Sequence, residues 1–258
     1  MEGRYPRAIR LIRTNCTDAA EEASFNQWYD RVHVPSVLSS GMVARVVRYR
    51  NADPDDEAGP GYLAIHELAW DDLGAVAREA VGIRQRLTRS GGFHPALEIV
   101  KAESWQRIGP ELRTPPADER PVAGIFLIES RCTDPQRETE FNAWYDETHI
   151  GDLLDTRLFM SAYRFALAAQ GTMIGAAVPN EADLTAGASG DAGGATYLAI
   201  YETATESLAA VEEFSRVHRP RLKASGRLSD LIEVTWRGIY RQMIPTMCST
   251  AAPSRYRS

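Results

Sequence analysis

The chain repeats itself, and this repetition constrains its fold more than any other feature. The segment CTDAAEEASFNQWYDRVHVPSVL, residues 16–38, matches CTDPQRETEFNAWYDETHIGDLL, residues 132–154, at an offset of 116 positions. The segment YLAIHE, residues 62–67, then matches YLAIYE, residues 197–202, at an offset of 135. The second copy therefore carries 19 extra residues, which fall within the Gly- and Ala-rich stretch 168–195. Two copies are too few for a solenoid of about three or more units, so we expect a pair that closes on itself.

Each copy is expected to run in the order β-α-β-β-α-β. Asp18 and Asp134 are expected helix N-caps, and Pro35 is expected to end the first helix near His33. We predict strands over residues 8–15, 42–50, 62–68, 96–107, 122–131, 157–166, 196–203 and 229–241, and long second helices over 72–90 and 206–225. Four antiparallel strands with two helices on one face form a ferredoxin-like unit. Two such units can enclose a lumen between their helix-free faces.

This pattern divides the chain into a first unit over residues 1–109, a linker over 110–121, a second unit over 122–243 and a tail over 244–258. The insertion at 168–195 is expected to be a mobile lid, because glycine-rich sequence buries little area and costs much entropy to order.

Composition narrows the class of protein. The chain has 258 residues, is 44% hydrophobic and 25% charged, and carries a net charge of −6. That acidic balance does not favour nucleic-acid binding. The longest nearly apolar run, residues 122–128, is far short of the roughly 20 residues that span a bilayer. With three cysteines, no CxxC motif and no signal-peptide pattern, we expect a cytoplasmic protein without a structural metal.

The motif FNxWYDxxHxPxxL, followed by a strand with Arg48 and then by YLAIHE, resembles the dimeric α+β barrel superfamily, and within it the EthD-like branch. The resemblance implies an α+β fold in which two fused ferredoxin-like units form one barrel that relatives build as a homodimer. Those relatives include muconolactone isomerases, polyketide cyclases, cofactor-free monooxygenases, haem enzymes of the chlorite dismutase type and stress proteins. Fold alone does not choose among these functions.

The helix motif supplies the first candidate residues. Asn26, Asp30 and His33 share one edge of the helix, with Tyr29 and Trp28 beside them. The helix C-terminus and Asp30 are both expected to raise the pKa of His33, which suits general acid/base chemistry. Asn142, Asp146 and His149 repeat the arrangement in the second copy. The alternative is a structural trio that ties the helix to the following loop.

The alternation of residues along the strands identifies a second group of candidate residues. We expect Leu63 and Ile65 to face the helices, so that Tyr62 and His66 face the lumen, as Tyr197 and Tyr201 do in the second copy. The same reasoning places Arg10 in the lumen. Because Arg10 and His66 differ from their counterparts, the site is expected around them, with His33 as the favoured motif histidine. The alternatives are that Arg10 lies at an exposed rim and that His66 is an ordinary strand histidine.

Several other residues are expected to be structural. Arg48 and Arg164 are expected to pair with helix carboxylates, Cys16 and Cys132 to pack, and His94 and His218 to be surface or structural residues. Haem ligation by His66 is a minor alternative.

The resulting hypothesis is a cofactor-independent lyase, isomerase, dehydratase or cyclase that acts on a small apolar or aromatic metabolite in the lumen. The expected catalytic residues are His33, His66, His149, Asp30 and Tyr29. The expected substrate-binding residues are Arg10, Tyr62, Trp28, Asn26, Tyr197 and Tyr201. The alternatives are a cofactor-free monooxygenase acting on an aromatic substrate and a non-catalytic binding or stress-response protein. The partners expected are a small-molecule substrate and, for a homodimer, a second copy of the chain; no nucleic acid or membrane is expected.

Overall fold

The computed structural model describes residues 6–52, 59–114, 120–171, 194–243 and 247–248. The first half contains β1 (Ala8–Cys16), α1 (Glu22–Trp28), α2 (Val34–Leu38), β2 (Val43–Asn51), β3 (Tyr62–Leu68), α3 (Leu73–Arg89) and β4 (Leu97–Arg113). The second half contains β5 (Gly124–Cys132), α4 (Glu138–Trp144), α5 (Ile150–Leu154), β6 (Ser161–Gly171), β7 (Thr196–Thr203), α7 (Ala209–Ala224) and β8 (Ile232–Gln242). A short strand, β9 (Met247–Cys248), follows. The expected fold class, two fused βαββαβ units, is confirmed.

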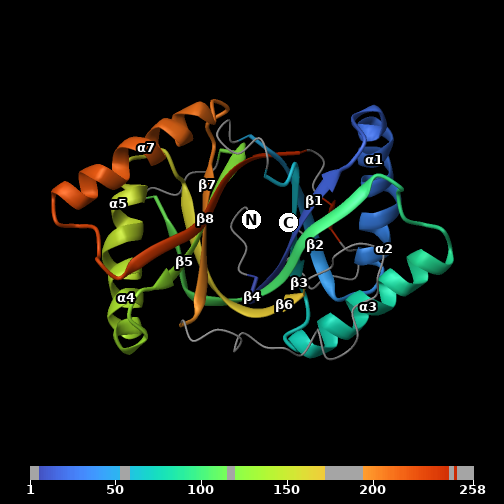
Figure 1. Cartoon of the computed structure of the whole chain (residues 1–258), viewed down its shortest axis with the longest axis horizontal. Helices are drawn as coiled ribbons and strands as arrows, with labels where there is room; N and C mark the ends of the chain where they lie inside the picture. Colours follow the sequence, from blue (N-terminus) through green and yellow to red (C-terminus); the bar gives the residue numbers. More distant parts are fainter. Residues whose placement is uncertain (1–5, 53–58, 115–119, 172–193, 244–246, 249–258) are drawn as a thin grey trace.

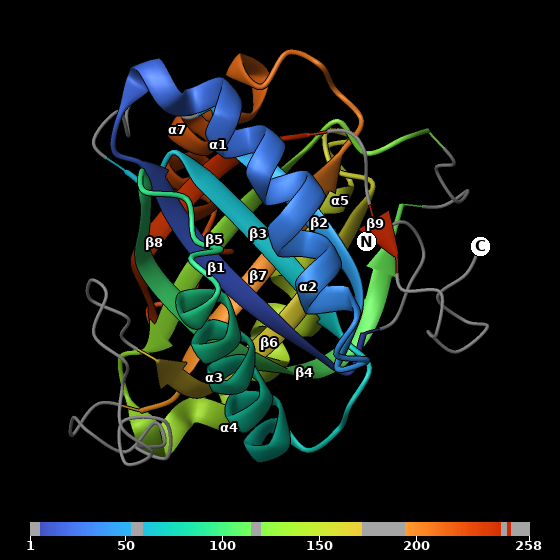
Figure 2. The ribbon, with the colours of Figure 1, turned by 90° about the vertical axis from the view of Figure 1, so that its right-hand side faces the viewer.

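The strands form one closed antiparallel barrel. Neighbouring strands follow the order β3-β1-β4-β6-β7-β5-β8-β2, and pairing between β2 and β3 closes the ring. The two halves meet along unequal seams. β4 pairs with β6 from Ala102↔Gly171 to Arg113↔Ser161, whereas β2 pairs with β8 only from Tyr49↔Gln242 to Asn51↔Tyr240. The helices of each half cover opposite outer sides of the barrel (Figure 1), and α1, α2 and α3 cross over the first-half strands (Figure 2).

Side chains from both halves pack together in the lumen. Leu63 and Ile65 of β3 meet Leu198 and Ile200 of β7 there, and Trp105 is fully buried among them. The expected strand orientation is therefore wrong: Tyr62 and His66, like Arg10 on β1, face the helices. The physical reason is that every residue of β3 is buried, so both faces of the strand are apolar environments and hydrophobicity alone does not tell them apart.

The lumen also holds a cluster of charged residues. Arg13 of β1 makes ion pairs with Glu129 of β5 and with Glu103 of β4, the latter at 3.4 Å. The guanidinium of Arg13 also lies over the ring of Trp236, 4.0 Å from its centroid. Lys101 Nζ lies 2.6 Å from Glu103 and 3.6 Å from Glu129. Opposite charges thus compensate one another in this buried region.

The motif helix continues past His33, contrary to expectation. A π-helical turn over Tyr29–His33 joins α1 to α2, and an equivalent turn over Tyr145–His149 joins α4 to α5. Pro35 lies in the first turn of α2, directly after the π-helical turn, and the helix continues through it. The π turn brings His33 onto Trp28, with ring centroids 5.3 Å apart.

Two differences concern chain boundaries. β4 runs through Pro110 to Arg113, into the range expected to be a linker. The expected lid lies largely in residues 172–193, which are outside the described residues. Among the helices of the described chain, none is long and apolar enough to cross a membrane.

Candidate functional site

The polar residues of the motif form a clamp between helix and sheet. Arg48 of β2 donates hydrogen bonds to Asp30 at 2.6 Å and to Asn26 at 2.7 Å, and its guanidinium lies 4.1 Å from the Tyr29 ring centroid. Arg164 makes the equivalent bonds to Asp146 at 2.9 Å and to Asn142 at 2.7 Å. The expected pairing of both arginines with helix carboxylates is therefore confirmed.

The tyrosines expected in the lumen extend these clamps or pack behind them. Asn26 donates a hydrogen bond to the Tyr62 hydroxyl at 3.0 Å, and Asn142 donates one to Tyr197 at 3.0 Å. Tyr201 is buried, with its hydroxyl 3.4 Å from that of Tyr145. Asn26, Asp30, Tyr29 and Tyr62 thus take part in contacts between α1 and its following π-helical turn and the first-half strands, and Tyr197 ties α4 to the second-half strands. Their expected catalytic and substrate-binding roles stay predictions.

Two cavities lie between the sheet and the helices, at equivalent places in the two halves. The first, which we call the α3 pocket, has a volume of about 70 Å³ and lies under α2 and α3. The second, the α7 pocket, has a volume of about 280 Å³ and lies under α5 and α7. They share a motif histidine and a helix arginine at matching positions: His33 and Arg84 in one, His149 and Arg219 in the other. Both cavities lie between the helices and the sheet, outside the lumen, and a ligand site inside the barrel stays a prediction.

The α3 pocket brings together Arg10, His33 and His66. Burial lowers the pKa of Arg10 to about 10, so its guanidinium is charged at neutral pH. Burial, and then the charge of Arg48, lower the pKa of His33 to about 4. Burial lowers the pKa of His66 well below its ordinary value, and His33 and Arg10 lower it further. The expected rise in the pKa of His33 is wrong. Burial desolvates the imidazole, the helix continues past His33 so that no helix C-terminus lies beside it, and Asp30 pairs with Arg48 instead.

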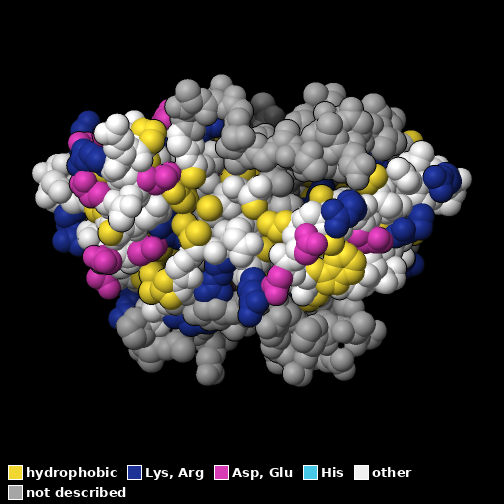
Figure 3. Space-filling model, turned by 90° about the horizontal axis from the view of Figure 1, so that it is seen from below, with side chains coloured by type: hydrophobic (Ala, Val, Ile, Leu, Met, Phe, Trp, Pro, Cys, Tyr) yellow, Lys and Arg dark blue, Asp and Glu magenta, His cyan; other side chains and the backbone are white. Residues whose placement is uncertain are grey.

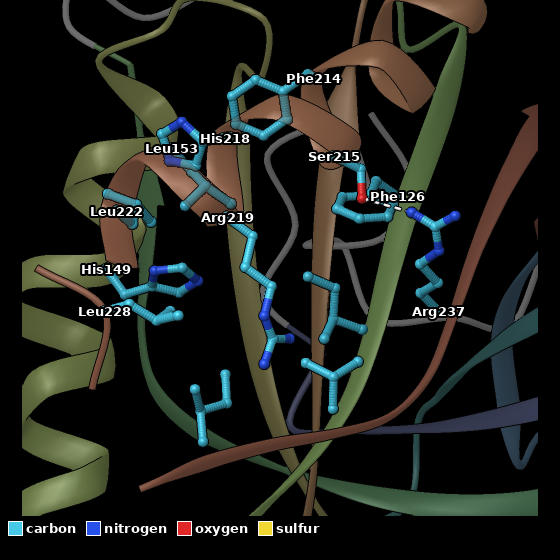
Figure 4. Close-up of a pocket in the computed structure, with 13 residues that line it drawn as sticks. Phe126, His149, Leu153, Phe214, Ser215, His218, Arg219, Leu222, Leu228 and Arg237 are labelled. Carbon is cyan, nitrogen blue, oxygen red and sulfur yellow. Dashed lines mark hydrogen bonds between the residues drawn. The ribbon is translucent and has the colours of Figure 1, made fainter. Parts of the chain in front are cut away.

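The α7 pocket contains His149, His218, Arg219, Arg237 and Ser215 on a largely apolar wall (Figure 4). Burial, and then the nearby His218, lower the pKa of His149 to about 3. The pKa of His218 is also lowered, chiefly by burial. Arg237 donates a hydrogen bond of 2.7 Å to Ser215, while the Arg219 side chain extends from α7 between the walls of the cavity. Both imidazoles are therefore neutral at pH 7 and lie beside cationic groups.

The sequence analysis interpreted His218 as a surface or structural residue and did not single out Ser215, Arg219 or Arg237. The equivalents of His218 and Arg237 in the first half are Ile83 and Ala102, so the repeat gave no pattern to follow. A signal did exist in helix α7. His218 lies four residues after Phe214 and four before Leu222, in the apolar stripe that faces the sheet, and its ring stacks on Phe214 with centroids 4.4 Å apart.

The linings of the two pockets carry positive charge only. Arginine and histidine are their only titratable residues, and neither lining includes an aspartate or glutamate. The outer surface differs, because basic and acidic side chains are interspersed over the described part of the face in Figure 3. Within the described chain, no group of three or more His, Cys, Asp or Glu side chains is placed to hold a metal ion.

The haem alternative requires a histidine beside room for a macrocycle. His66 lines the α3 pocket, whose volume of about 70 Å³ gives roughly five water-sized positions at about 10–15 Å³ each. That space is too small for a porphyrin. The residues around His66 therefore do not fit a haem.

Comparison with known proteins identifies the fold. No protein-family model and no curated protein matches the chain. An anthrone oxidase-like protein superposes with a TM-score of 0.57 at 9% identity, covering 95% of this chain and 94% of that chain. A dye-decolorizing peroxidase from Bacteroides thetaiotaomicron VPI-5482 gives 0.50 at 14% identity, with coverage of 93% and 94%. The encapsulated DyP-type peroxidase from Mycobacterium smegmatis gives 0.50 at 9%, with coverage of 97% and 96%. These likenesses show the dimeric α+β barrel fold.

Proposed function

We propose that the chain is a cofactor-independent enzyme that abstracts a proton from a small, largely aromatic substrate bound in the α7 pocket. The observation that carries this proposal is the pair of neutral histidines, His149 and His218, beside two arginines in an otherwise apolar cavity. Isomerases, lyases, dehydratases and cyclases can all begin with such a proton transfer. The internal repeat further supports the proposal that this is a tandem EthD-like protein.

His149 is proposed as the general base. Its Nδ1 atom is buried and has no hydrogen-bond partner among the described residues, and its ring is held by stacking on Trp144 at 4.7 Å. A base must be unprotonated before it acts, and burial ensures this at neutral pH. A substrate anion beside the ring would raise the pKa of His149 toward its ordinary value, because an opposite charge stabilises imidazolium. The base would thus become stronger when the substrate is bound.

Arg219 and Arg237 are proposed to bind the anionic part of the substrate. Cationic donors stabilise the oxyanion that forms when a proton leaves the carbon next to a carbonyl group. The cavity offers roughly twenty water-sized positions, using about 10–15 Å³ for each. Phe126 and Phe214 provide aromatic walls. The pocket therefore fits a ligand of one to three rings that carries a carboxylate, an enolate or a phenolate.

A cofactor-free oxidation is the second candidate. The same base would deprotonate an electron-rich hydroxyaromatic compound, and the resulting anion could then react with dioxygen. The aromatic walls of the α7 pocket and the fold-level likeness to an anthrone oxidase-like protein favour this alternative. Oxygen consumption distinguishes it from isomerisation or elimination, which consume none.

Proton abstraction can be tested before the full reaction is identified. The full chain would be incubated in D₂O with arylpyruvates and anthrones, and replacement of the acidic C–H by C–D would be followed by NMR. The wild-type protein should accelerate exchange with at least one of these probes. His149→Gln should reduce the rate by about 10²–10⁴-fold, as expected for loss of a positioned base.

His94→Gln is the matched control. His94 accepts a backbone hydrogen bond from Ala96 and lies outside both pockets, so its replacement should leave exchange unchanged. Loss of exchange only in His33→Gln would instead place the base in the first half, where the sequence led us to expect it. Tight binding of a probe without any exchange would support the non-catalytic alternative.

A further inference from the structure

We propose that the α3 pocket is a second ligand site, which binds the carboxylate of a short-chain organic acid between Arg10, His33 and His66. This site is separate from the α7 pocket, so the proposal stands or falls independently of the function proposed above. It rests on an unpaired charge, unpaired imidazole nitrogens, a cavity of suitable size and a contrast with the other half.

Arg10 is the first feature of the α3 pocket that indicates an anion site. Arg10 is 9% exposed and lines the cavity, and it makes no ion pair or hydrogen bond within the described part of the chain. The lining also contains Arg84, which adds positive charge, and no carboxylate. Burying a lone charge costs considerable free energy unless a counter-charge is supplied. A bound anion would supply it.

The second observation concerns the imidazoles. His66 is 4% exposed, and neither of its ring nitrogens has a hydrogen-bond partner among the described residues. Nδ1 of His33 is also buried without such a partner. A neutral imidazole carries one N–H that can donate to an anion. Arg10 and His66 are directly opposite each other on β1 and β3, so their side chains are neighbours on one face.

The size and the remaining walls define the ligand. At about 10–15 Å³ per water-sized position, the cavity holds roughly five non-hydrogen atoms. A carboxylate occupies three of those positions with its carbon and two oxygens. Ile12, Val37, Met42 and Phe93 surround the rest with apolar surface. An acid with one or two further carbons matches this space, and an inorganic oxyanion would leave the apolar surface unused.

The second half shows that these polar groups are not needed to build the fold. The cross-strand pair Arg10–His66 is replaced there by Phe126–Tyr201, whose rings pack 6.2 Å apart. The second half instead carries His218 and Arg237 on α7 and β8. The two pockets therefore present their donors from different elements, which fits two different ligands.

Isothermal titration of the full chain with sodium acetate, in chloride-free buffer, tests the site. Acetamide serves as the uncharged analogue and sodium nitrate as the inorganic oxyanion. The double variant Arg10→Phe/His66→Tyr installs the pair that the second half already packs. We expect millimolar acetate binding that this variant weakens about tenfold or more, because charge-assisted hydrogen bonds in a buried site are lost. If the double variant fails to fold, Arg10→Met makes the same test.

Arg237→Ala is the control for the other pocket, because the equivalent residue in the first half is Ala102. Arg237→Ala should keep the acetate binding that the double variant loses, and any acetate binding that it does lose belongs to the α7 pocket. The proposal is overturned if acetate does not bind, if the double variant binds it unchanged, or if only Arg237→Ala loses binding. Nitrate or acetamide binding as tightly as acetate would also overturn the assignment to a carboxylate.

Discussion

Replacing Arg164 with methionine tests whether the polar motif residues are structural. The side chain is 1% exposed and donates two hydrogen bonds, to Asp146 and Asn142, while lying 4.2 Å from the Tyr145 ring centroid. Each charge-assisted bond contributes about 1.5–3 kcal/mol. Asp146 is 32% exposed, so water compensates part of the loss. We expect Arg164→Met to lower the free energy of unfolding by about 3 kcal/mol, toward the low end of the range for broken buried pairs.

Urea unfolding followed by tryptophan fluorescence would measure this change, and the melting temperature should fall by about 6–12 °C. Arg48→Met removes the equivalent clamp and should cost a similar amount. Arg216→Met is the exposed control, because its pair with Glu213 lies on the surface of α7, and it should change stability by less than about 0.5 kcal/mol. A loss below about 1 kcal/mol in Arg164→Met, together with lost exchange activity in Asp146→Asn, would refute the structural interpretation.

Two further predictions concern stability. Burial lowers the pKa of His33 to about 4 and that of His149 to about 3. Below pH 6.5 the unfolded chain therefore binds more protons than the folded chain, so the stabilisation is present at pH 7 and is lost as the pH falls toward these values. Each histidine should lower the free energy of unfolding by about 2 kcal/mol between pH 7 and pH 5. The melting temperature should therefore fall less between these pH values in His33→Gln than in the wild type, and equal falls would contradict this. A Cβ at Gly238 would lie 2.7 Å from two aromatic rings, whereas one at Gly151 in α5 meets nothing within 4 Å. Gly238→Ala should therefore lower the free energy of unfolding by about 1–3 kcal/mol, and Gly151→Ala should raise it by about 0.5–1 kcal/mol. Melting temperatures that shift in the same direction in both variants would contradict this.

Most of the fold could be predicted from the internal repeat, because matching segments at equal spacing indicate two equivalent units. The third strand of each half begins and ends where the sequence predicts, at residues 62–68 and 196–203. The orientation of those strands could not be predicted in the same way. Leu63 and His66 are both buried, one in the lumen and one under the helices, and sequence alternation does not say which buried face is which.

The candidate site was predicted in part. Arg10, His33 and His66 do come together, although outside the lumen. The larger α7 pocket was missed because its second histidine, His218, occupies the position of an isoleucine in the first half. The pKa of His33 was predicted in the wrong direction because local sequence shows its neighbours along the helix, while burial comes from the sheet beneath it.

The ion pair between Arg13 and Glu129 favours the pairing of two unlike halves. These residues are 116 positions apart, so they occupy the same place in the two halves, and they touch each other across the barrel. Two first halves brought together would set Arg13 against a second arginine, and two second halves would set glutamate against glutamate. Like charges in a buried contact repel, so this contact disfavours two identical halves and favours two unlike ones. The charged residues of the lumen therefore favour a barrel made of one first half and one second half over barrels made of two identical halves.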